Sequence, residues 1–476
     1  MKLDEVRSAR FLVLGAARSG IAAARLLHHH GANVIVGDSK SAEQATAIAQ
    51  ELQSAGIPTV WGDEAIAAAL PDRDIIVKSP GIPQENQLIV AARAAGARII
   101  SEIELASAFL PAGARVIAIT GTNGKTTVTS WTAHVLAGCG FHAVPAGNIG
   151  QAWAAHLIEG PAAPDKTVYV IEVSSFQLED LEDFRPDVAV LTNLSPDHMD
   201  RYQDSMELYA AAKANLLRNM TASDVFIWNG ADPTSIIIAD KAHSQKWTFF
   251  AGRTPGGAEN HSPLPGERGW ERDGVIMIRS SNEDPGMQLM NVEDLPIPGQ
   301  HNLENALAVI LACRAVGAQP EAIAQHLMTF GGVEHRIEFC GRRRDGVAFY
   351  NDSKATNLDA MEKAVVAFHE PMVLIAGGRD AHSDYASINH LITSHVAQLI
   401  TLGEAAPLIE NAWGKLIPTQ RADTMEDAVM TANRLAKTGQ VVVFSPACKS
   451  FDMYSNYEER GRDFKAKVAQ ALAEQQ

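Results

Sequence analysis

The chain has 476 residues, of which 46% are hydrophobic, and a formal net charge of −16 at pH 7. This length is typical of about three domains. The acidic balance argues against a nucleic-acid partner, because nonspecific binding to nucleic acid needs a basic surface. The four cysteines have no CxxC spacing, so they indicate neither a disulfide framework nor a zinc site.

The apolar segments are short throughout the chain. No run reaches the length of a membrane span, so we expect no membrane partner. The first apolar run, residues 11–14, is too short for a signal peptide and follows acidic residues. We therefore expect a cytoplasmic protein, and we expect it to be a monomer.

The first segment, residues 1–110, alternates β-branched apolar runs with alanine-rich stretches. This pattern predicts buried parallel strands joined by helices, as in a Rossmann-like domain. The predicted strands are residues 11–14, 34–36 and 75–77, and the predicted helices are residues 20–30, 42–55 and 86–95.

The first strand-to-helix turn runs from Gly15 to Gly20 and includes Ser19. A dinucleotide-binding turn has a glycine where this chain has Ala17, so the turn does not favour NAD binding. Asp38 ends the second predicted strand, at the position of an acid that binds a ribose or a base. The pattern is compatible with a uridine-type nucleotide.

A glycine-rich loop opens the second segment, residues 111–332. It reads Gly121-Thr-Asn-Gly-Lys-Thr-Thr127 between an apolar strand and a helical pattern. Such a loop directs backbone N–H groups and a helix N-terminus at phosphates, while Lys125 adds a charge and Thr126 a hydroxyl for Mg²⁺. A tight turn with a solvated lysine is the less favoured alternative. The loop predicts binding of a nucleoside triphosphate.

Two further strands are predicted in this segment, at residues 168–173 and 188–191. Ligands collect at the carboxyl ends of parallel strands, so Glu172 and His198 are expected to converge near Lys125. Residues 252–273 are expected to form a surface loop. Helices are predicted at residues 303–316 and 323–330, and Asn302 and Asn305 share one helical edge.

The third segment, residues 333–476, is predicted to be another doubly wound α/β unit. Its predicted strands are residues 347–350, 372–376, 399–402 and 441–445, and its predicted helices are 358–368, 425–437 and 457–472. Polar clusters follow three of these strands, at residues 351–356, 377–380 and 445–450. We expect the three clusters to form one binding surface.

These motifs together resemble the Mur ligases of peptidoglycan synthesis. The similarity covers the whole chain in order and includes the phosphate loop, Glu172, and the motifs at residues 197–202, 299–302, 334–336 and 351–357. The segments Ser79-Pro-Gly-Ile82 and Gly147-Asn-Ile-Gly150 match the branch of the family that adds D-glutamate to UDP-N-acetylmuramoyl-L-alanine. The resemblance implies three α/β domains that hold the uridine nucleotide, ATP and the amino acid in turn.

The resemblance also implies a chemistry, in which the substrate carboxylate attacks the γ-phosphate of ATP and the amine displaces phosphate from the resulting acyl phosphate. Lys213, which by itself resembles a solvated helix residue, matches the carbamylated lysine of the family. With Thr126, Glu172 and His198 it would hold two Mg²⁺ ions, and Lys354 would face the reacting carboxyl group. The implied ATP contacts are Gly121, Thr122, Asn123, Gly124, Lys125, Thr126, Thr127, Asn302, Asn305, Arg336 and Asp352.

The two remaining substrates are implied to be UDP-N-acetylmuramoyl-L-alanine and glutamate. The implied contacts of the uridine substrate are Gly15, Ser19, Asp38, Ser79, Pro80, Gly81, Asn148 and His198. The implied contacts of the amino acid are Thr356, Arg379, Lys449, Ser450, Phe451 and Tyr457.

One departure from the family concerns the charge of the amino acid. D-Glutamate-adding members usually have a lysine where this chain has Ala381, and that lysine pairs with the side-chain carboxylate. An unpaired buried carboxylate is costly. We hypothesise that Arg379, His382 or Lys449 supplies the missing cation; the alternative is a different amino acid, either L-glutamate or a neutral one.

Two other functions stay open as alternatives. Folylpolyglutamate synthase shares the phosphate loop and the fold, but the N-terminal βαβ segment with Ser79-Pro-Gly-Ile82 argues against it. A nonenzymatic nucleotide-binding regulator would bind ATP without releasing phosphate in the presence of both other substrates.

Overall fold

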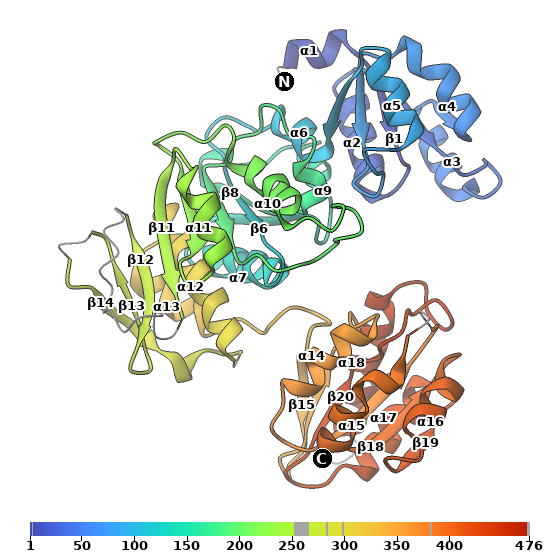
Figure 1. The fold of residues 1–476 in the computed structure, drawn as a ribbon, viewed down its shortest axis with the longest axis vertical. Coiled ribbons are helices and arrows are strands. Elements are labelled where there is room, and N and C mark those ends of the chain that lie inside the picture. The colour runs from blue at the N-terminus through green and yellow to red at the C-terminus, as the bar shows by residue number, and fades with distance from the viewer. Residues whose placement is uncertain (2, 252–265, 282–283, 298, 381–382, 474–476) are drawn as a thin grey trace. The chain divides into compact units, whose positions relative to one another are not determined.

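The computed structural model describes residues 1, 3–251, 266–281, 284–297, 299–380 and 383–473 (Figure 1). The chain divides into two compact units, Met1–Phe330 and Gly331–Gln476, which we call unit 1 and unit 2. Within the described ranges, no helix is both long enough and apolar enough to cross a membrane. Ala381, which stands where D-glutamate-adding members usually have a lysine, and His382, one of the three candidate cations, lie outside the described residues.

Unit 1 begins with a five-stranded parallel sheet in the order β3-β2-β1-β4-β5, shown in blue in Figure 1. Its strands are β1 (Arg10–Leu14), β2 (Asn33–Asp38), β3 (Thr59–Trp61), β4 (Ile75–Lys78) and β5 (Arg98–Ser101). Its helices are α1 (Leu3–Ser8), α2 (Arg18–His29), α3 (Thr46–Ser54), α4 (Asp63–Ala69), α5 (Gln87–Ala94) and α6 (Glu102–Ser107). The predicted strands and helices are all present, and strands β3 and β5 and helices α1, α4 and α6 are additions.

The second sheet of unit 1 has nine strands in the order β14-β13-β12-β11-β10-β9-β6-β8-β7. The strands are β6 (Arg115–Thr120), β7 (His142–Gly147), β8 (Thr167–Glu172), β9 (Val188–Leu191), β10 (Val225–Asn229), β11 (Gln245–Phe250), β12 (Arg268–Arg272), β13 (Val275–Arg279) and β14 (Met287–Asn291). The helices are α7 (Lys125–Gly138), α8 (Trp153–His156), α9 (Ser175–Leu178), α10 (Met206–Ala214), α11 (Pro233–Asp240), α12 (Gln300–Ala315) and α13 (Pro320–Leu327). The two antiparallel hairpin pairings, β12 with β13 and β13 with β14, lie at one edge.

The predicted surface loop at residues 252–273 is wrong at its C-terminal end. Residues 268–272 form strand β12, which pairs with β11 and β13. The charges of this segment hid the strand, because Arg268 is only 1% exposed and Trp270 is also buried. The rest of the predicted loop, up to residue 265, lies outside the described residues.

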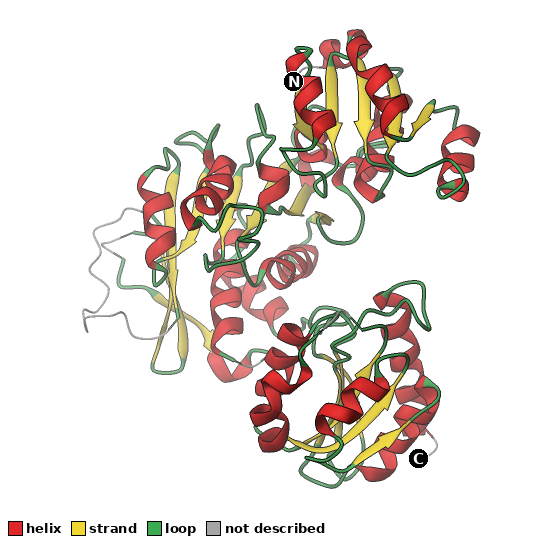
Figure 2. Cartoon of the chain, turned by 45° about the vertical axis from the view of Figure 1, so that its right-hand side comes forward, coloured by secondary structure: helices red, strands yellow, loops and turns green. Residues whose placement is uncertain are grey.

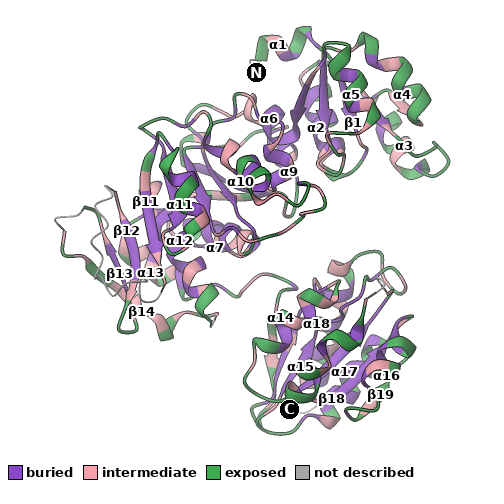
Figure 3. Ribbon diagram, in the orientation of Figure 1, coloured by how far each residue is buried: buried purple, intermediate pink, exposed green. Residues whose placement is uncertain are grey.

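The two sheets of unit 1 share a core. The middle strands β6, β8 and β9 are buried along almost their whole length, which explains their continuous apolar sequences (Figure 3). One hydrophobic cluster includes Val6 of helix α1 and Phe11 of the first sheet and extends to Phe226 of the second sheet and Ala242. The N-terminal and central domains are therefore packed into one body.

Unit 2 contains a six-stranded sheet in the order β15-β16-β20-β17-β18-β19, parallel except for β15. Its strands are β15 (Glu338–Arg342), β16 (Ala348–Asn351), β17 (Met372–Gly377), β18 (Val396–Leu402), β19 (Thr419–Arg421) and β20 (Val441–Phe444). Its helices are α14 (Leu358–Val366), α15 (Asn389–His395), α16 (Ala406–Trp413), α17 (Met425–Leu435) and α18 (Tyr457–Ala473). Helices cover both faces of the sheet (Figure 2). A hydrophobic cluster on each face packs these helices against the strands. The predicted α/β class is confirmed in both units.

Candidate active site

The phosphate loop connects strand β6 to helix α7, as the pattern predicted. Gly121 and Gly124 have φ values of 143° and 81°. A Cβ atom added at Gly121 would lie 1.9 Å from Thr192 Oγ1, and one added at Gly124 would lie 2.4 Å from Asn305 Oδ1. Both the backbone conformation and the available space therefore require glycine at these positions.

The segment after strand β9 braces this loop. The backbone N–H of Thr122 donates to Asn193 O at 2.9 Å, and that of Asn123 donates to Asn193 Oδ1 at 2.9 Å. Thr192 Oγ1 donates to Asn123 O at 2.6 Å. Thr192 and Asn193 were not among the predicted site residues, although their place directly after a buried strand could have indicated them.

Lys125 and Thr126 form the first turn of α7. The Lys125 ammonium donates to the carbonyls of Gly121 and Thr122 at 3.0 and 2.7 Å, which holds it over the loop. Thr126 is buried, and Thr127 is partly exposed. The first N–H groups of a helix have no intrahelical acceptors, so this turn favours an anion.

Glu172 lies at the carboxyl end of strand β8 and is 3% exposed. Its Oε1 accepts a hydrogen bond from Asn148 Nδ2 at 3.0 Å, whereas its Oε2 is buried with no partner among the described residues. A Cβ at Gly147 would lie 2.4 Å from the Glu172 carbonyl oxygen, so the segment carrying Asn148 packs directly on β8. A buried carboxylate oxygen without a donor fits a bound cation.

Lys213 lies on helix α10 and is buried, being 3% exposed. Its Nζ donates to Gly121 O at 2.8 Å, so it contacts the phosphate loop. Burial, reinforced by the charge of Lys125, lowers the pKa of Lys213 to about 7. A large fraction of this lysine is therefore the neutral amine near neutral pH.

His198 occupies a more open position. It has a left-handed backbone with φ of 55°, and its side chain is 50% exposed. Its Nε2 lies 3.6 Å from Asp197 Oδ2, and its ring centroid lies 4.9 Å from that of Phe176. In the described part of the chain, no His, Cys, Asp and Glu side chains gather in threes as a metal site would need.

Asn302 and Asn305 lie on helix α12, which packs against α7. Asn305 Nδ2 donates to Asn302 Oδ1 at 3.2 Å, so the two share one edge of the helix as predicted. The close approach of Asn305 to Gly124 places this edge against the phosphate loop.

Gly15, Asp38 and Ser79, three of the residues predicted for the uridine substrate, lie at one end of the first sheet. A Cβ at Gly15 would lie 2.7 Å from Ser79 Cβ, because the loops after β1 and β4 are neighbours. The Asp38 carboxylate accepts hydrogen bonds from the backbone of Ala16 at 2.8 Å and of Lys40 at 3.0 Å. Asp38 therefore also fixes the first turn.

A second loop joins this end of the sheet from the central domain. Arg18 Nη1, at the start of helix α2 beside Ser19, donates to Gly150 O at 3.0 Å. The loop that carries Asn148 therefore meets the first turn.

Two cations clamp the loop of Ser79, Pro80 and Gly81, and the sequence had assigned a role to neither. Arg201 donates to Pro80 O at 3.2 Å and to Ile82 O at 3.4 Å. Lys78 Nζ also donates to Ile82 O, at 3.0 Å, and lies 3.0 Å from Asp180 Oδ2. The loop is thus tied to the central domain.

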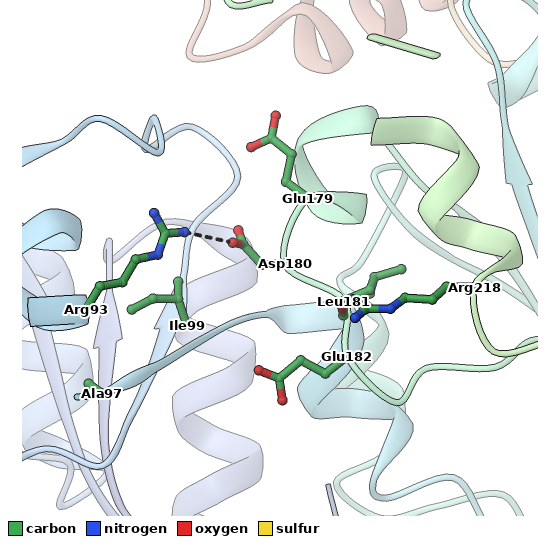
Figure 4. Close-up of a pocket in the computed structure, with 8 residues that line it drawn as sticks. All are labelled: Arg93, Ala97, Ile99, Glu179, Asp180, Leu181, Glu182 and Arg218. Carbon is green, nitrogen blue, oxygen red and sulfur yellow. Dashed lines mark hydrogen bonds and ion pairs between the residues drawn. The ribbon is translucent and has the colours of Figure 1, made fainter. Parts of the chain in front are cut away.

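A pocket of about 290 Å³ lies at this junction between the N-terminal and central domains (Figure 4). An ion pair between Arg93 and Asp180, at 3.7 Å, crosses it. None of the predicted site residues lines it. The lining residues are Arg93, Ala97, Ile99, Glu179, Asp180, Leu181, Glu182 and Arg218.

In unit 2, the cluster after β16 is held by the cluster after β20. Ser445 Oγ donates to Asp352 Oδ2 at 2.8 Å, and burial raises the pKa of Asp352 to about 7. Lys354 N donates to His335 O at 3.1 Å, directly before Arg336. Thr356 N donates in turn to Lys354 O at 2.9 Å.

The cluster after β17 is joined to the same loops. Arg379 and Lys449 exchange two backbone hydrogen bonds of 2.8 and 3.0 Å. The Arg379 guanidinium forms two hydrogen bonds to the Glu404 carboxylate, at 3.0 and 3.1 Å. The Lys449 side chain is exposed. The structure therefore brings together the three polar clusters of the third segment.

Ser450 and Phe451, which follow Lys449, face different surroundings. Ser450 is 2% exposed, whereas Phe451 is 57% exposed. Tyr457 begins helix α18, and its ring lies 5.7 Å from Lys354 Nζ. The predicted amino-acid contacts thus surround Lys354 and Lys449.

A phosphate loop at the end of a central strand, with a buried carboxylate and a buried amine beside it, defines a nucleotide-binding α/β protein built for phosphate chemistry. Three family models match the chain in order: the MurD-like N-terminal domain at residues 9–101, the Mur ligase middle domain at 119–313, and the Mur ligase glutamate ligase domain at 335–448.

Curated relatives match the chain over nearly its whole length. A UDP-N-acetylmuramoylalanine--D-glutamate ligase of Salinibacter ruber is 41% identical over 99% of the chain and 100% of its own length. A protein of the same name from Chlorobaculum tepidum is 40% identical over 98% and 99%. The crystal structure of a UDP-N-acetylmuramate-alanine ligase from Thermotoga maritima has the same fold, with a TM-score of 0.56, 19% identity, and coverage of 97% of this chain and 100% of that one. The chain belongs to the Mur ligase family.

Proposed function

We propose that this chain is an ATP-dependent ligase that joins D-glutamate to UDP-N-acetylmuramoyl-L-alanine during cytoplasmic synthesis of peptidoglycan precursors. The observation that carries the proposal is the 41% identity, over the full length, to a relative that bears this name. The phosphate loop, with Glu172 and Lys213 buried beside it, supplies a place for the phosphate chemistry.

Each domain has its own substrate in this proposal. Residues 1–110 bind the uridine nucleotide, residues 111–332 bind ATP, and residues 333–476 bind the amino acid, in a monomeric enzyme. The first turn, the Ser79 loop and the Asn148 loop meet at the end of the first sheet, which supports a common uridine site there.

In this proposal the enzyme accelerates the reaction by positioning the substrates and by neutralising the charge of the phosphates. The carboxylate of UDP-N-acetylmuramoyl-L-alanine attacks the γ-phosphorus of ATP, which gives an acyl phosphate and releases ADP. The amine of D-glutamate then adds to the acyl carbon, and inorganic phosphate leaves as the amide forms. Lys125 neutralises the phosphates from the helix N-terminus, with Asn302 and Asn305 beside it.

The proposal also includes two Mg²⁺ ions. Thr126, Glu172, His198 and a carbamylated Lys213 would hold them, and the unpartnered Oε2 of Glu172 supports this assignment. Bound Mg²⁺ would neutralise phosphate charge during transfer. The neutral amine of Lys213 can add CO₂ and lose a proton, which turns a buried cation into an anionic ligand.

The side-chain carboxylate of D-glutamate needs a cation in the absence of a lysine at position 381. Lys449 is the better of the two described candidates, because its side chain is exposed while the Arg379 guanidinium is engaged by Glu404. The hydroxyl groups of Thr356 and Ser450 and the rings of Phe451 and Tyr457 complete the proposed pocket.

Phosphate release tests the proposed function directly. Full-length protein is incubated with ATP, Mg²⁺, UDP-N-acetylmuramoyl-L-alanine and one of D-glutamate, L-glutamate, D-glutamine or glycine. We expect release with D-glutamate alone, together with a product whose mass has increased by one glutamyl residue. Release with L-glutamate or a neutral amino acid instead would reassign the third substrate, and release with none of them would contradict the ligase function.

A further inference from the structure

Helix α18 buries an arginine that the reaction does not use. Arg460 is 2% exposed and lies on the buried face of the helix with Phe464, Val468 and Ala471. This spacing places a guanidinium in a core position of the helix. Long cationic side chains are almost never fully buried unless they are paired.

The hydrogen bonds of Arg460 connect two of the three clustered loops. Its Nε donates to Ser353 Oγ at 3.1 Å, and its Nη2 donates to Ser353 O at 2.9 Å and to Cys448 O at 3.0 Å. Ser353 belongs to the loop after β16, and Cys448 belongs to the loop after β20. One side chain therefore spans both loops.

The third loop lies against the remaining nitrogen. A Cβ atom at Gly378 would lie 2.9 Å from Arg460 Nη1, so this nitrogen abuts the loop after β17. Nη1 is buried and has no hydrogen-bond partner among the described residues. Arg460 thus contacts all three loops that carry the proposed amino-acid contacts.

The charge of Arg460 is not neutralised by a contact ion pair. Other cations of α18 have carboxylate partners within 4 Å: Lys465 pairs with Glu334 and Glu338, and Lys467 pairs with Glu426. Among the described residues, Arg460 has no carboxylate within that distance.

The Asp452 carboxylate attracts the charge of Arg460 from beyond contact distance and offsets only part of the cost of its burial. A buried cation without a contact partner is strongly destabilising. Burial lowers the pKa of Arg460 to about 10, which leaves it cationic at neutral pH. In a poorly polarisable interior such a charge acts over a longer distance than in water. The potential at the three loops is therefore more positive than their own side chains would make it.

We propose that Arg460 is a positioning residue that holds the three loops together and, through its unpaired charge, makes the amino-acid site select an anionic side chain. This inference rests on the proposed function, since it concerns the choice between glutamate and a neutral analogue of the same shape. Arg460 acts through the loops, because its Nη1 is covered by Gly378.

The test compares two variants of the full-length enzyme. Arg460→Met removes the charge and the hydrogen bonds, and Arg460→Lys keeps the charge but loses the fork that spans Ser353 and Cys448. For each protein we would measure the KM for D-glutamate, the Ki of D-glutamine as a competitor, and the KM for ATP. The ratio of Ki to KM isolates the charge, because loosened loops weaken both ligands equally.

We expect the ratio to fall at least fivefold in Arg460→Met and to stay within twofold of wild type in Arg460→Lys. A change in the KM for ATP would report loosening of the loop that carries Ser353 and Asp352, and it does not enter the ratio. An unchanged ratio in Arg460→Met would overturn the inference, as would an equal fall in both variants. If Arg460→Met fails to fold by circular dichroism, Arg460→Gln replaces it under the same criteria. A wild-type enzyme that does not use glutamate at all would instead contradict the proposed function.

Discussion

The charged side chains near the phosphate loop of unit 1 differ in burial from those on the loops after β16, β17 and β20 in unit 2. Around the phosphate loop, Glu172 and Lys213 are both 3% exposed; Lys213 donates to the Gly121 carbonyl, and Glu172 accepts from the Asn148 side chain. In unit 2, Arg379 and Lys449 lie at the surface, and the buried charge of Arg460 lies beneath them. The side chains proposed for phosphate chemistry are thus buried in unit 1. The side chains proposed to select the amino acid are exposed, and a buried cation lies beneath them in unit 2.

The comparison predicts the largest losses at the buried carboxylate. We expect Glu172→Gln to lower kcat by about 10³-fold, because it keeps the shape but removes the charge from a preorganised site. Phosphate release at saturating substrates measures the effect, and Glu159→Gln, at an exposed position in the same domain, is the matched control. A loss below tenfold would exclude Glu172 from the reaction.

Lys213→Met should lower kcat by about 10²-fold, because methionine cannot add CO₂. The loss should not be recovered by added bicarbonate, whereas wild-type activity should rise with bicarbonate near pH 7, where the amine is partly neutral. Lys166→Met, an exposed substitution of the same kind, should respond to bicarbonate as wild type does. Equal responses in all three proteins would contradict the carbamate.

The same lysine predicts a dependence of stability on pH. Its pKa is about 7 in the folded protein against an ordinary value of 10.5, so between these values only the unfolded chain binds the proton. The free energy of unfolding of wild type should then rise with pH relative to Lys213→Met, by up to about 1.4 kcal/mol per pH unit. Values of Tm at pH 7, 8 and 9 in CO₂-free buffer measure this; a constant difference between the two proteins would refute the depressed pKa.

A smaller effect is expected at the surface of unit 2. Lys449→Ala should raise the KM for D-glutamate about tenfold, the cost of one charged hydrogen bond. Arg379→Ala should raise it about threefold at most, because Glu404 already engages the guanidinium. Steady-state kinetics with both variants show which substitution raises the KM for D-glutamate more. Two unchanged KM values would show that neither Lys449 nor Arg379 pairs with the substrate carboxylate.

The smallest effect belongs to the exposed partner of Arg379. Glu404→Gln should leave the free energy of unfolding close to that of wild type, since the ion pair is about half exposed on both sides and is screened by solvent. It should also leave kcat within twofold of wild type. Urea unfolding followed by circular dichroism checks the first expectation, and a loss of several kcal/mol would show that this ion pair is structural.

Most of the fold could be predicted because its strands are continuous apolar runs that end in polar residues. The phosphate loop, Glu172 and the edge formed by Asn302 and Asn305 followed from local patterns. The burial of Lys213 could not be predicted from α10 alone, since the loop that covers it comes from residues 121–124. Strand β12 was missed because Arg268 is buried against the usual preference of arginine.

Arg460 was also missed, although a signal was present. It stands four residues before Phe464 and eight before Val468, in the buried stripe of α18. The acidic and basic residues around it give the segment the composition of a solvent-exposed helix. The charged composition therefore hid the apolar periodicity that marks position 460 as buried. The three loops that it contacts come from distant parts of the chain, so only the folded structure reveals their meeting point.

The seam between the two sheets of unit 1 limits how the chain can be divided. Glu104 is fully buried and accepts hydrogen bonds of 2.9 to 3.0 Å across the seam from the backbone of Glu182, Asp183 and Phe184, and Lys78 pairs across the same seam with Asp180. Separating the N-terminal domain from the rest of the chain near residue 110 would leave buried carboxylate and ammonium groups without their partners. The expected loss in folding free energy is about 3–5 kcal/mol for each broken pair. The N-terminal domain is therefore not freely exchangeable between relatives, and chimeras should inherit both halves of this seam from one parent.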